Sequence, residues 1–387
     1  MFDELKDPMV RLMLDLSKEN MGDVMNLKQR LAQTNVASLF ELCREHELDG
    51  VVASHILQAN LIELPDAWRK AYQKQQAHLS FLKEKAANIC QIMDENGIRM
   101  VVLKNGGIMS DMVADPAACP MEDIDSLVKK SDFKKAHQIL LKEGFLFKFR
   151  SEFEEEDLET AFRDGATEYR LETPAGESMW FELAWRAVAG RWIRRDLEPN
   201  TDELMRDVYC ASGTKVGILS AEDNLLQVSV HTAKHSYVRA PGLRLHLDVE
   251  RIVAHKKIDW ELFLEKVGNA HVKTSTYYSL YLAKMLFGTP IPEAVLNALR
   301  PCRSKDKRLL KLINKAGLLH PRRRKFSKLQ FLIFQTSLYD NLTDAWLVLC
   351  PPNGGLREIY GYTNPLMTPC YLVLRALDLV GIRKKKK

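Results

Sequence analysis

The chain has 387 residues, of which 46% are hydrophobic and 28% are charged, a composition typical of a globular protein with enough material for a sizeable core. Its net charge is +5, and the C-terminal run 383–387 (RKKKK) alone supplies five positive charges. The rest of the chain is therefore nearly neutral, which argues against a protein that binds polyanions over its whole surface.

Targeting signals are not apparent in the sequence. The beginning, MFDELKDPMVRLMLDL, has acidic residues where a signal peptide has a basic region, and it lacks a continuous apolar stretch. No segment approaches the ~18 uncharged apolar residues of a membrane span. The seven cysteines are scattered and form no CxxC pair, which is typical of free thiols in a reducing compartment. We therefore expect a cytoplasmic protein.

Helical periodicity dominates both ends of the chain. In residues 1–96 apolar side chains recur at steps of three and four, and the long amphipathic pattern after Pro65 ends at Gly97. The same periodicity returns after about residue 200. We therefore predict an N-terminal helical region (1–96), a small α/β core (97–195) and a helical C-terminal region with a basic tail (196–387).

The predicted core opens with short apolar runs separated by turn signals. The run 98–104 ends at AsnGlyGly (105–107), as a buried strand does before a tight turn. A short helix and a proline-bounded loop then lead into DIDSLV (123–128), the second predicted strand. Ser131 and the following Asp open a helix that ends at Gly144.

Three further runs, FLFKFR, TEYRLET and MWFELAW, have the composition and alternation of strands. A ProAlaGly turn separates the last two, and the acidic stretch EFEEEDLE before them is expected to be a solvated loop. These features indicate an α+β fold in which a small mixed sheet has flanking helices.

Asp123 and Asp125 are two residues apart in the strand DIDSLV. Both side chains therefore project from one face, while Ile124 points into the core. Neighbouring carboxylates repel each other unless a cation lies between them, and Mg²⁺ prefers oxygen ligands while keeping water and phosphate in the rest of its shell. Such triplets are common, however, and alone this one indicates only an exposed strand end.

Three neighbouring features favour a metal site. Gly106 and Gly107 lie between a strand and a helix, where backbone N–H groups and the helix dipole can bind a triphosphate, although a plain tight turn has the same sequence. Lys104, at the end of the strand, can reach a phosphate, although an isolated lysine is more often a solvated charge. Glu182 lies within the apolar strand MWFELAW, where it either faces solvent or joins the site as a third metal ligand or as the base for an acceptor hydroxyl.

The motifs LKNGG, MEDIDSLV and FELAW resemble those of the uncharacterised bacterial nucleotidyltransferase family of the polymerase-β-like superfamily. The similarity continues through AEDNLLQVSVHTAKHS, LRLHLDVERIV and PPNGGLREIYG. The resemblance implies a polymerase-β-like nucleotidyltransferase core. It also implies that the protein transfers a nucleoside monophosphate from an NTP to an acceptor hydroxyl and releases pyrophosphate.

The same resemblance implies which residues form the site. Asp123, Asp125 and Glu182 are the implied metal ligands, for two Mg²⁺ ions or for Mn²⁺ in their place. The acceptor is not encoded in any motif, and a small molecule, a sugar or a peptide is favoured over nucleic acid. The implied triphosphate loop comprises Lys104, Asn105, Gly106 and Gly107.

The chain departs from the family pattern at three places. Asn105 stands where the family usually has Gly, and Ala184 stands where it usually has His. The segment 118–120 lacks the Arg that usually precedes the first Asp, and this loss removes a phosphate or substrate contact. The alternative to an active enzyme is therefore a catalytically degenerate fold that binds a nucleotide or a partner protein.

Two further motifs favour no single role. His231 and His235 are one helical turn apart and can chelate a metal, but Thr232 stands where a zinc protease has Glu, so a structural or substrate-side role is predicted. Asp248 can face the acceptor, or it can serve as a helix cap or ion-pair partner.

Two basic segments remain. The cluster 303–328 can bind nucleic acid, but it lacks a recognisable binding module, so a solvated helical face is predicted. The RKKKK tail follows an amphipathic stretch and can make peripheral contact with an anionic membrane, although a solvated terminus is the prediction.

Overall fold

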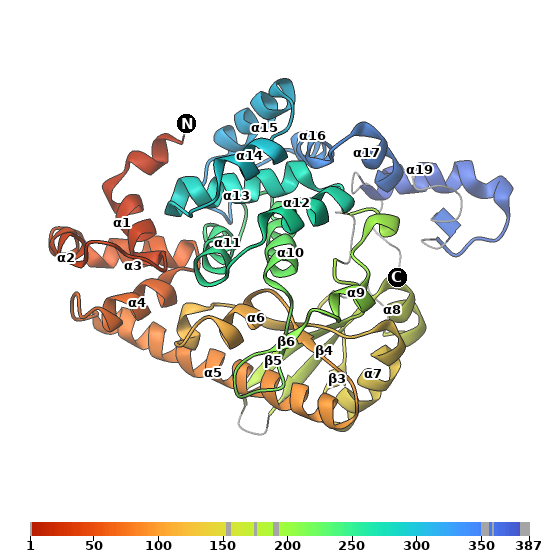
Figure 1. The fold of residues 1–387 in the computed structure, drawn as a ribbon, viewed down its shortest axis with the longest axis horizontal. Helices are drawn as coiled ribbons and strands as arrows, with labels where there is room; N and C mark the ends of the chain where they lie inside the picture. The colour runs from red at the N-terminus through yellow and green to blue at the C-terminus, as the bar shows by residue number, and fades with distance from the viewer. Residues whose placement is uncertain are drawn as a thin grey trace.

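The computed structural model describes residues 2–151, 156–173, 176–188, 193–349, 356–357 and 360–379. Helices come first, then a mixed sheet with interspersed helices, and then helices again (Figure 1). The first helical stretch contains a 3₁₀ helix, η1 (Asp3–Lys6), followed by α1 (Pro8–Ser17), α2 (Val24–Ala32), α3 (Val36–Glu45), α4 (Asp49–Gln58) and α5 (Asp66–Glu95).

Among the described residues, seven strands form one sheet in the order β3-β4-β5-β2-β1-β7-β6. The central strand β2 runs parallel to β5 and antiparallel to β1, and β1 runs parallel to β7. The sheet is therefore mixed, with β2 and β5 side by side near its middle. The strands are β1 (Val101–Val102), β2 (Asp123–Leu127), β3 (Leu146–Phe147), β4 (Ala166–Glu172), β5 (Ser178–Ala184), β6 (Tyr209–Cys210) and β7 (Gly217–Ile218).

Short helices connect these strands. The long helix α5 ends just before Gly97, whose φ of 74° is readily adopted only by glycine. The helix after β2 likewise ends near Gly144, at φ 85°. The connecting elements are α6 (Lys104–Asp111), η2 (Pro116–Ala118), η3 (Lys130–Asp132), α7 (Phe133–Lys142), α8 (Leu158–Asp164), η4 (Arg195–Leu197) and α9 (Thr201–Leu204).

The two faces of the sheet have different coverings. Ile124 and Phe181 are buried in the large core that includes residues of α5, α6 and α7. Leu127 and Ala184 project from the opposite face, where they join a smaller apolar cluster with residues in and after α9. Because side chains alternate along a strand, Asp123 and Asp125 share this second face with Leu127. We call it the carboxylate face.

The second helical stretch begins at Ser220, whose hydroxyl caps α10 by accepting from the Asp223 N–H group. In Figure 1 its first helices, α10 and α11, lie next to α6, and α16, α17 and α19 extend away to the right. The stretch contains α10 (Ala221–Lys234), α11 (Arg244–His255), α12 (Trp260–Asn269), α13 (Lys273–Phe287), α14 (Glu293–Leu299), α15 (Arg303–Ala316), α16 (Lys328–Leu338), α17 (Leu342–Leu349), η5 (Pro365–Met367) and α19 (Thr368–Leu379).

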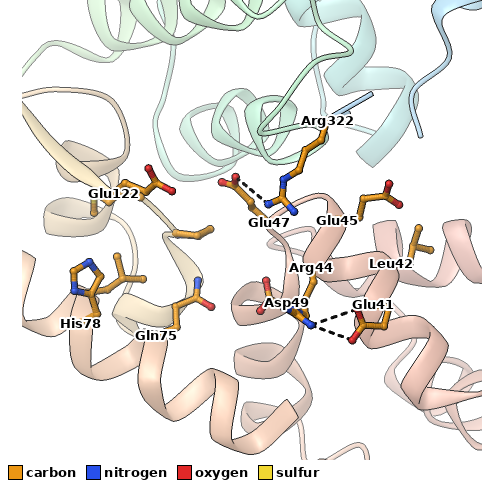
Figure 2. Close-up of a pocket in the computed structure, with 13 residues that line it drawn as sticks. Glu41, Leu42, Arg44, Glu45, Glu47, Asp49, Gln75, His78, Glu122 and Arg322 are labelled. Atoms are coloured by element: carbon orange, nitrogen blue, oxygen red, sulfur yellow. Dashed lines mark hydrogen bonds and ion pairs between the residues drawn. The ribbon is translucent and has the colours of Figure 1, made fainter. Parts of the chain in front are cut away.

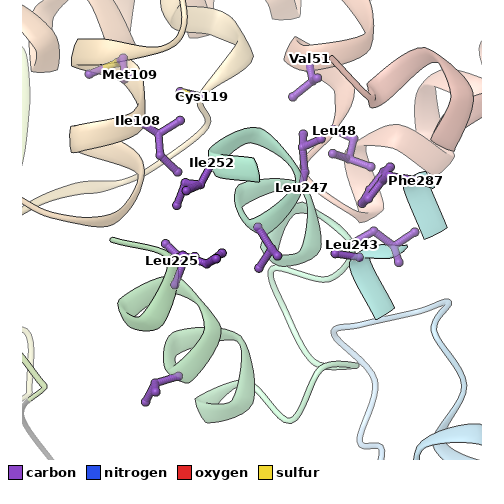
Figure 3. Close-up of a cluster of buried hydrophobic side chains, with 14 of the residues drawn as sticks. Leu48, Val51, Ile108, Met109, Cys119, Leu225, Leu243, Leu247, Ile252 and Phe287 are labelled. Carbon is purple, nitrogen blue, oxygen red and sulfur yellow. The ribbon is translucent and has the colours of Figure 1, made fainter. Parts of the chain in front are cut away.

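One apolar core joins the first helical stretch, the sheet region and the second helical stretch. Figure 3 shows side chains of α4, α6, α10 and α11 pointing toward one another around α11. Burial of this shared surface holds α6, which begins at Lys104, between the N-terminal and C-terminal helices. The side chains labelled there are Leu48, Val51, Ile108, Met109, Cys119, Leu225, Leu243, Leu247, Ile252 and Phe287.

The structure confirms the predicted α+β class and the helix that stops before Gly97. It differs from the expectation of continuous helix after about residue 200, because β6 and β7 add to the sheet edge. Each of these strands has two residues, too few for a detectable alternation. Every helix within the described ranges is too short or too polar to pass through a bilayer. Parts of the EFEEEDLE loop and of the ProAlaGly turn, and the whole of the PPNGG motif and the RKKKK tail, lie outside the described residues.

Candidate functional site

A row of three carboxylates crosses neighbouring strands on the carboxylate face. Asp125 on β2 is in register with Glu182 on β5, and Glu182 is in register with Glu168 on β4. Residues in register on adjacent strands project from the same face and lie close together. Asp123, two residues before Asp125, adds a fourth carboxylate to this face. The structure thus brings together the three acidic residues predicted from the sequence and adds Glu168.

Lys104 neutralises part of this charge. Its Nζ donates to Oδ1 of Asp125 at 2.7 Å, and the two side chains are 24% and 11% exposed. Burial raises the pKa of Asp125 to about 7; Lys104 opposes this rise, while Glu182 and Asp123 add to it. Burial acts to lower the pKa of Lys104, but the carboxylates of Asp125 and Glu182 raise it overall, so the ammonium stays charged.

The backbone of Lys104 is strained. Its φ is 52°, in the left-handed region that non-glycine residues rarely occupy and that costs roughly 1–3 kcal/mol. This conformation occurs where β1 passes into α6, and the same residue delivers its ammonium to Asp125. Strain of this kind is common at functional sites. The sequence predicted a phosphate-reaching role for Lys104, and the ion pair with Asp125 was not foreseen.

Arg150 is the second cation on this face. Its guanidinium forms an ion pair with Asp123 and lies 5.2 Å from the centre of the Trp180 ring. Its Nε is 4.0 Å from Oε1 of Glu168, and its backbone N–H donates to Oε2 of the same residue at 2.7 Å. Burial acts to lower the pKa of Arg150, but Asp123 and Glu168 raise it overall. Both candidate metal-binding aspartates are therefore paired with a cation.

The AsnGlyGly sequence at the start of α6 serves close packing. A Cβ on Gly106 would lie 2.6 Å from a methyl carbon of Val102, and one on Gly107 would lie 2.6 Å from the Val102 carbonyl oxygen. Larger residues would push α6 away from β1. Asn105 is buried and donates through Nδ2 to the carbonyl of Pro120 at 2.9 Å. It thus ties α6 to the segment that enters β2.

The first turn of α6 nevertheless remains compatible with anion binding. The first N–H groups of any α-helix lack partners within the helix and carry the positive end of its dipole. In α6 these groups lie beside Lys104, which reaches Asp125 on the carboxylate face. The predicted triphosphate loop, residues 104–107, therefore stays a prediction that this geometry supports in part.

The helix α10 borders the same region. Gln227 donates to the carbonyl of Ala187, just after β5, at 3.3 Å. Burial lowers the pKa of His231 strongly, and the nearby charge of Lys104 lowers it further. The rings of His231 and His235 have centres 4.9 Å apart, and Nδ1 of His235 lies 2.6 Å from the carbonyl of Ala240. This placement suits a structural or substrate-side role for the pair.

Asp248 belongs to a separate group of charges around α11, the α11 charge cluster, which contains Arg244, Asp248, Arg251, Glu19 and Glu47. Nε of Arg251 donates to Oε1 of Glu19 at 2.7 Å, and Arg244 pairs with Glu47 at 3.1 Å. Burial raises the pKa of Asp248 to about 6, while Arg244 and Arg251 act against the rise. Asp248 is only 3% exposed, which favours an internal electrostatic role.

The side chains of the candidate site indicate which metal ion it could hold. Asp123, Asp125 and Glu182 offer only carboxylate oxygens from one face, the ligand type that Mg²⁺ prefers. Within the described residues, no three His, Cys, Asp or Glu side chains converge closely enough to hold an ion. The two aspartates point instead to Lys104 and Arg150. The residue types fit Mg²⁺, and binding would require the aspartates to exchange these cations for metal.

A family comparison gives this arrangement its context. A family model described as uncharacterised nucleotidyltransferase matches residues 32–288, from the end of α2 to just beyond α13. The chain belongs to this nucleotidyltransferase family. The match includes every residue of the carboxylate face described above, and the family implies a polymerase-β-like core and an NTP substrate. No curated protein and no solved structure matches the chain.

Two residues of the carboxylate face, Arg150 and Glu168, were missed by the sequence reasoning. Glu168 lies in the strand predicted from TEYRLET, and the pairing of β4 with β5 places it in register with Glu182. The expected pairing of these two strands could therefore have indicated Glu168 from the sequence. Arg150 follows the short strand β3, and its ion pair with Asp123 spans 27 residues, so no local pattern indicated it.

The protein also has a cavity of about 710 Å³ next to the segment that enters β2. Figure 2 shows it between α3, α4, α5 and that segment, with Arg322 reaching in from the C-terminal stretch. Glu122 lines the cavity and directly precedes Asp123. The carboxylates of the candidate site do not line it, and several of its own charges are paired, as in Arg44 with Glu41 and Arg322 with Glu47.

The basic cluster 303–328 is partly internal to the fold. Lys305 donates to the Tyr339 carbonyl and to Oγ1 of Thr274, the latter at 3.1 Å. Lys325 donates to the carbonyls of Ala316 and Gly317 at 3.1 and 3.0 Å. These two lysines therefore make internal contacts, and the solvated helical face predicted from the sequence is wrong for them.

Proposed function

We propose that this protein transfers a nucleoside monophosphate from an NTP to the hydroxyl of an acceptor, with Asp123, Asp125 and Glu182 as ligands of Mg²⁺. In this reaction an acceptor oxygen forms a bond to the α-phosphorus, and the bond from that phosphorus to the bridging oxygen breaks. Pyrophosphate leaves, and a carboxylate takes the acceptor proton. Bound Mg²⁺ ions would stabilise the attacking and leaving oxygens.

One observation carries this proposal. Asp125 is in register with Glu182 on the adjacent parallel strand, and Asp123 projects from the same face two residues away. Three carboxylates on one face repel one another, and such an arrangement is retained where cations bind. Family membership supports the nucleotide as the substrate. The acceptor is proposed to be a small molecule, a sugar or a peptide, since the basic cluster is partly engaged within the fold.

Lys104 and the start of α6 supply the complementary charge. The Lys104 ammonium, which stays charged beside Asp125, can exchange that carboxylate for a phosphate oxygen once a metal ion neutralises the aspartate. The N–H groups of the first turn of α6 add the positive end of the helix dipole. We propose that Asn105, Gly106 and Gly107 hold this turn against β1, so that the phosphates meet a fixed surface.

The decisive experiment replaces Asp125 with Asn. The variant Asp125→Asn keeps the shape of the side chain and removes one metal-ligand charge. We expect Mg²⁺-dependent NTP binding and pyrophosphate release to fall about 100-fold or more, because metal binding contributes several kcal/mol. The melting temperature should stay nearly unchanged. The variant Glu122→Gln, one residue before Asp123, is the matched control and should behave as wild type; unchanged turnover in Asp125→Asn would refute the assignment.

A second candidate function is nucleotide binding without transfer. The ion pairs of Lys104 with Asp125 and Arg150 with Asp123 favour it, because they satisfy both aspartates without metal. The absence of the family's usual His at Ala184 and of its usual Arg in the segment 118–120 also favours binding without transfer. Calorimetric titration with each of the four NTPs and Mg²⁺, followed by a pyrophosphate-release assay, separates the two: binding without release supports the second candidate.

A further inference from the structure

Arg150 occupies a fixed position at the edge of the candidate site. The chain leaves β3 and is tied to β4, because the Arg150 N–H donates to Oε2 of Glu168 at 2.7 Å and the Lys148 N–H donates to the Glu168 carbonyl at 3.2 Å. The guanidinium then lies over Trp180 on β5 and pairs with Asp123 on β2. Three neighbouring strands thus position one side chain.

The side chain is held but not enclosed. It is 37% exposed, and its planar fork has five N–H donors. One ion pair with Asp123 and one longer contact with Glu168 leave donors for another partner. A guanidinium stacked on an aromatic ring keeps its edge available for hydrogen bonds. Arg150 can therefore bind an anion from solvent without leaving Trp180.

Charge balance requires such a cation. Asp123, Asp125, Glu182 and Glu168 place four carboxylates on one face, and an NTP brings a negatively charged triphosphate to it. Lys104 alone does not offset this charge even when metal ions are bound. The segment 118–120, where the family pattern has an Arg, consists of Ala, Cys and Pro and provides no charge.

We propose that Arg150 binds the triphosphate of the NTP and so supplies, from the segment after β3, the guanidinium that is missing before β2. Without metal it pairs with Asp123. When a metal ion takes the Asp123 carboxylate, the guanidinium turns to phosphate oxygens, which it can bind through two parallel hydrogen bonds. This inference rests on the proposed function, because it takes the NTP as the ligand of the carboxylate face.

Arg170 provides a matched control. Its guanidinium also lies over Trp180, 5.7 Å from the ring centre, and its side chain is 36% exposed. It pairs with Glu172 at 2.7 Å instead of with a carboxylate of the site. Replacing either arginine by Ala removes one positive charge that lies over Trp180. A difference in nucleotide affinity between the two variants therefore reflects the position of Arg150.

The experiment measures two affinities on the full-length protein. Electron paramagnetic resonance gives the affinity for Mn²⁺ alone, and calorimetry in Mn²⁺ gives the affinity for each of four non-hydrolysable NTP analogues. We expect Arg150→Ala to weaken analogue binding about 10- to 100-fold, as for the loss of a charged hydrogen bond. Its Mn²⁺ affinity should be equal to or higher than that of wild type, because a competitor for Asp123 is gone. Arg170→Ala should change neither affinity more than about 3-fold.

The outcomes distinguish the two proposals. Arg150→Lys should recover part of the analogue affinity, since it keeps the charge and loses the fork, and it provides the comparison if the Ala variant folds poorly. If Arg150→Ala and Arg170→Ala weaken analogue binding equally, or if Arg150→Ala loses Mn²⁺ binding as well, the role of Arg150 is overturned while the proposed function stands. If wild type binds none of the analogues in Mn²⁺, both fall.

Discussion

The carboxylate face and the α11 charge cluster both gather carboxylates and basic side chains, but the cations of the carboxylate face are more exposed than Arg251 of the cluster. On the carboxylate face the pairing cations, Lys104 and Arg150, are 24% and 37% exposed, so a ligand from solvent can replace their partners. In the α11 charge cluster Arg251 is 1% exposed, and its partner Glu19 comes from the N-terminal stretch. Breaking an enclosed pair is costly because it leaves a buried charge without its partner, whereas pairs open to exchange suit binding.

The largest effect should come from breaking the enclosed pair. In Arg251→Met the apolar volume is largely kept, but Glu19 loses its hydrogen bond from Nε and retains His255 as a partner at 2.9 Å. We expect a loss of about 3–5 kcal/mol in the free energy of unfolding, because a mostly buried carboxylate is left poorly compensated. Urea denaturation measures this quantity.

Replacing Arg150 by Met provides the comparison with Arg251→Met. Arg150→Met removes a pair whose side chains are 37% and 27% exposed, so its free energy of unfolding should change by less than about 1 kcal/mol. Equal losses in the two variants would contradict the distinction between enclosed and exchangeable pairs.

A smaller effect, with a defined pH dependence, is expected at Asp248. Its pKa in the folded protein is raised to about 6, mainly by burial, whereas an unfolded Asp has a pKa of about 3.9. The folded state therefore holds the proton more tightly, and the contribution of Asp248 to stability declines as the pH rises from about 4 to 6 and then levels off.

In Asp248→Asn this titration is absent. The stability of the variant relative to wild type should therefore increase between pH 4 and pH 7 by about 1–3 kcal/mol, at 1.36 kcal/mol per pKa unit. Urea denaturation at a series of pH values gives the difference directly. A difference that does not vary with pH would show that the Asp248 carboxylate is not destabilised by burial.

Much of the carboxylate face was predictable because its key residues lie in regular strands. The alternation in DIDSLV placed Asp123 and Asp125 on one face, and the apolar run around Glu182 indicated a strand whose carboxylate either faces solvent or joins a site. Local periodicity was sufficient for each strand alone. The family resemblance then supplied their common role, which the composition of single strands could not.

Pairings between distant segments were not predictable. The parallel register of Asp125 with Glu182 joins strands separated by α7, α8 and a hairpin, and parallel pairing depends on such long connections. The ion pair of Arg150 with Asp123 depends in turn on that sheet order. The α11 charge cluster joins Glu19 to Arg251 across 232 residues, so its carboxylates were indistinguishable in sequence from solvated ones.

The smallest predicted effect tests how the carboxylate face positions its own arginine. Oε2 of Glu168 accepts the Arg150 N–H at 2.7 Å, and Oε1 lies 4.0 Å from Nε. In Glu168→Gln the amide oxygen can still accept the N–H, but the charge beside the guanidinium is lost. Exposed pairs of this kind contribute about 0.2–1 kcal/mol, so affinity for an NTP analogue in Mn²⁺ should fall about 2- to 5-fold.

A double-mutant cycle decides whether this loss acts through Arg150. If Glu168 only positions the guanidinium, Glu168→Gln should have no further effect in the Arg150→Ala background, and the coupling between the two changes should equal the whole effect of the single variant. Calorimetry on the four proteins measures it. If the loss is the same in both backgrounds, Glu168 acts on the metal ions or the nucleotide directly, and the row Asp125–Glu182–Glu168 then functions as one set of ligands across three strands.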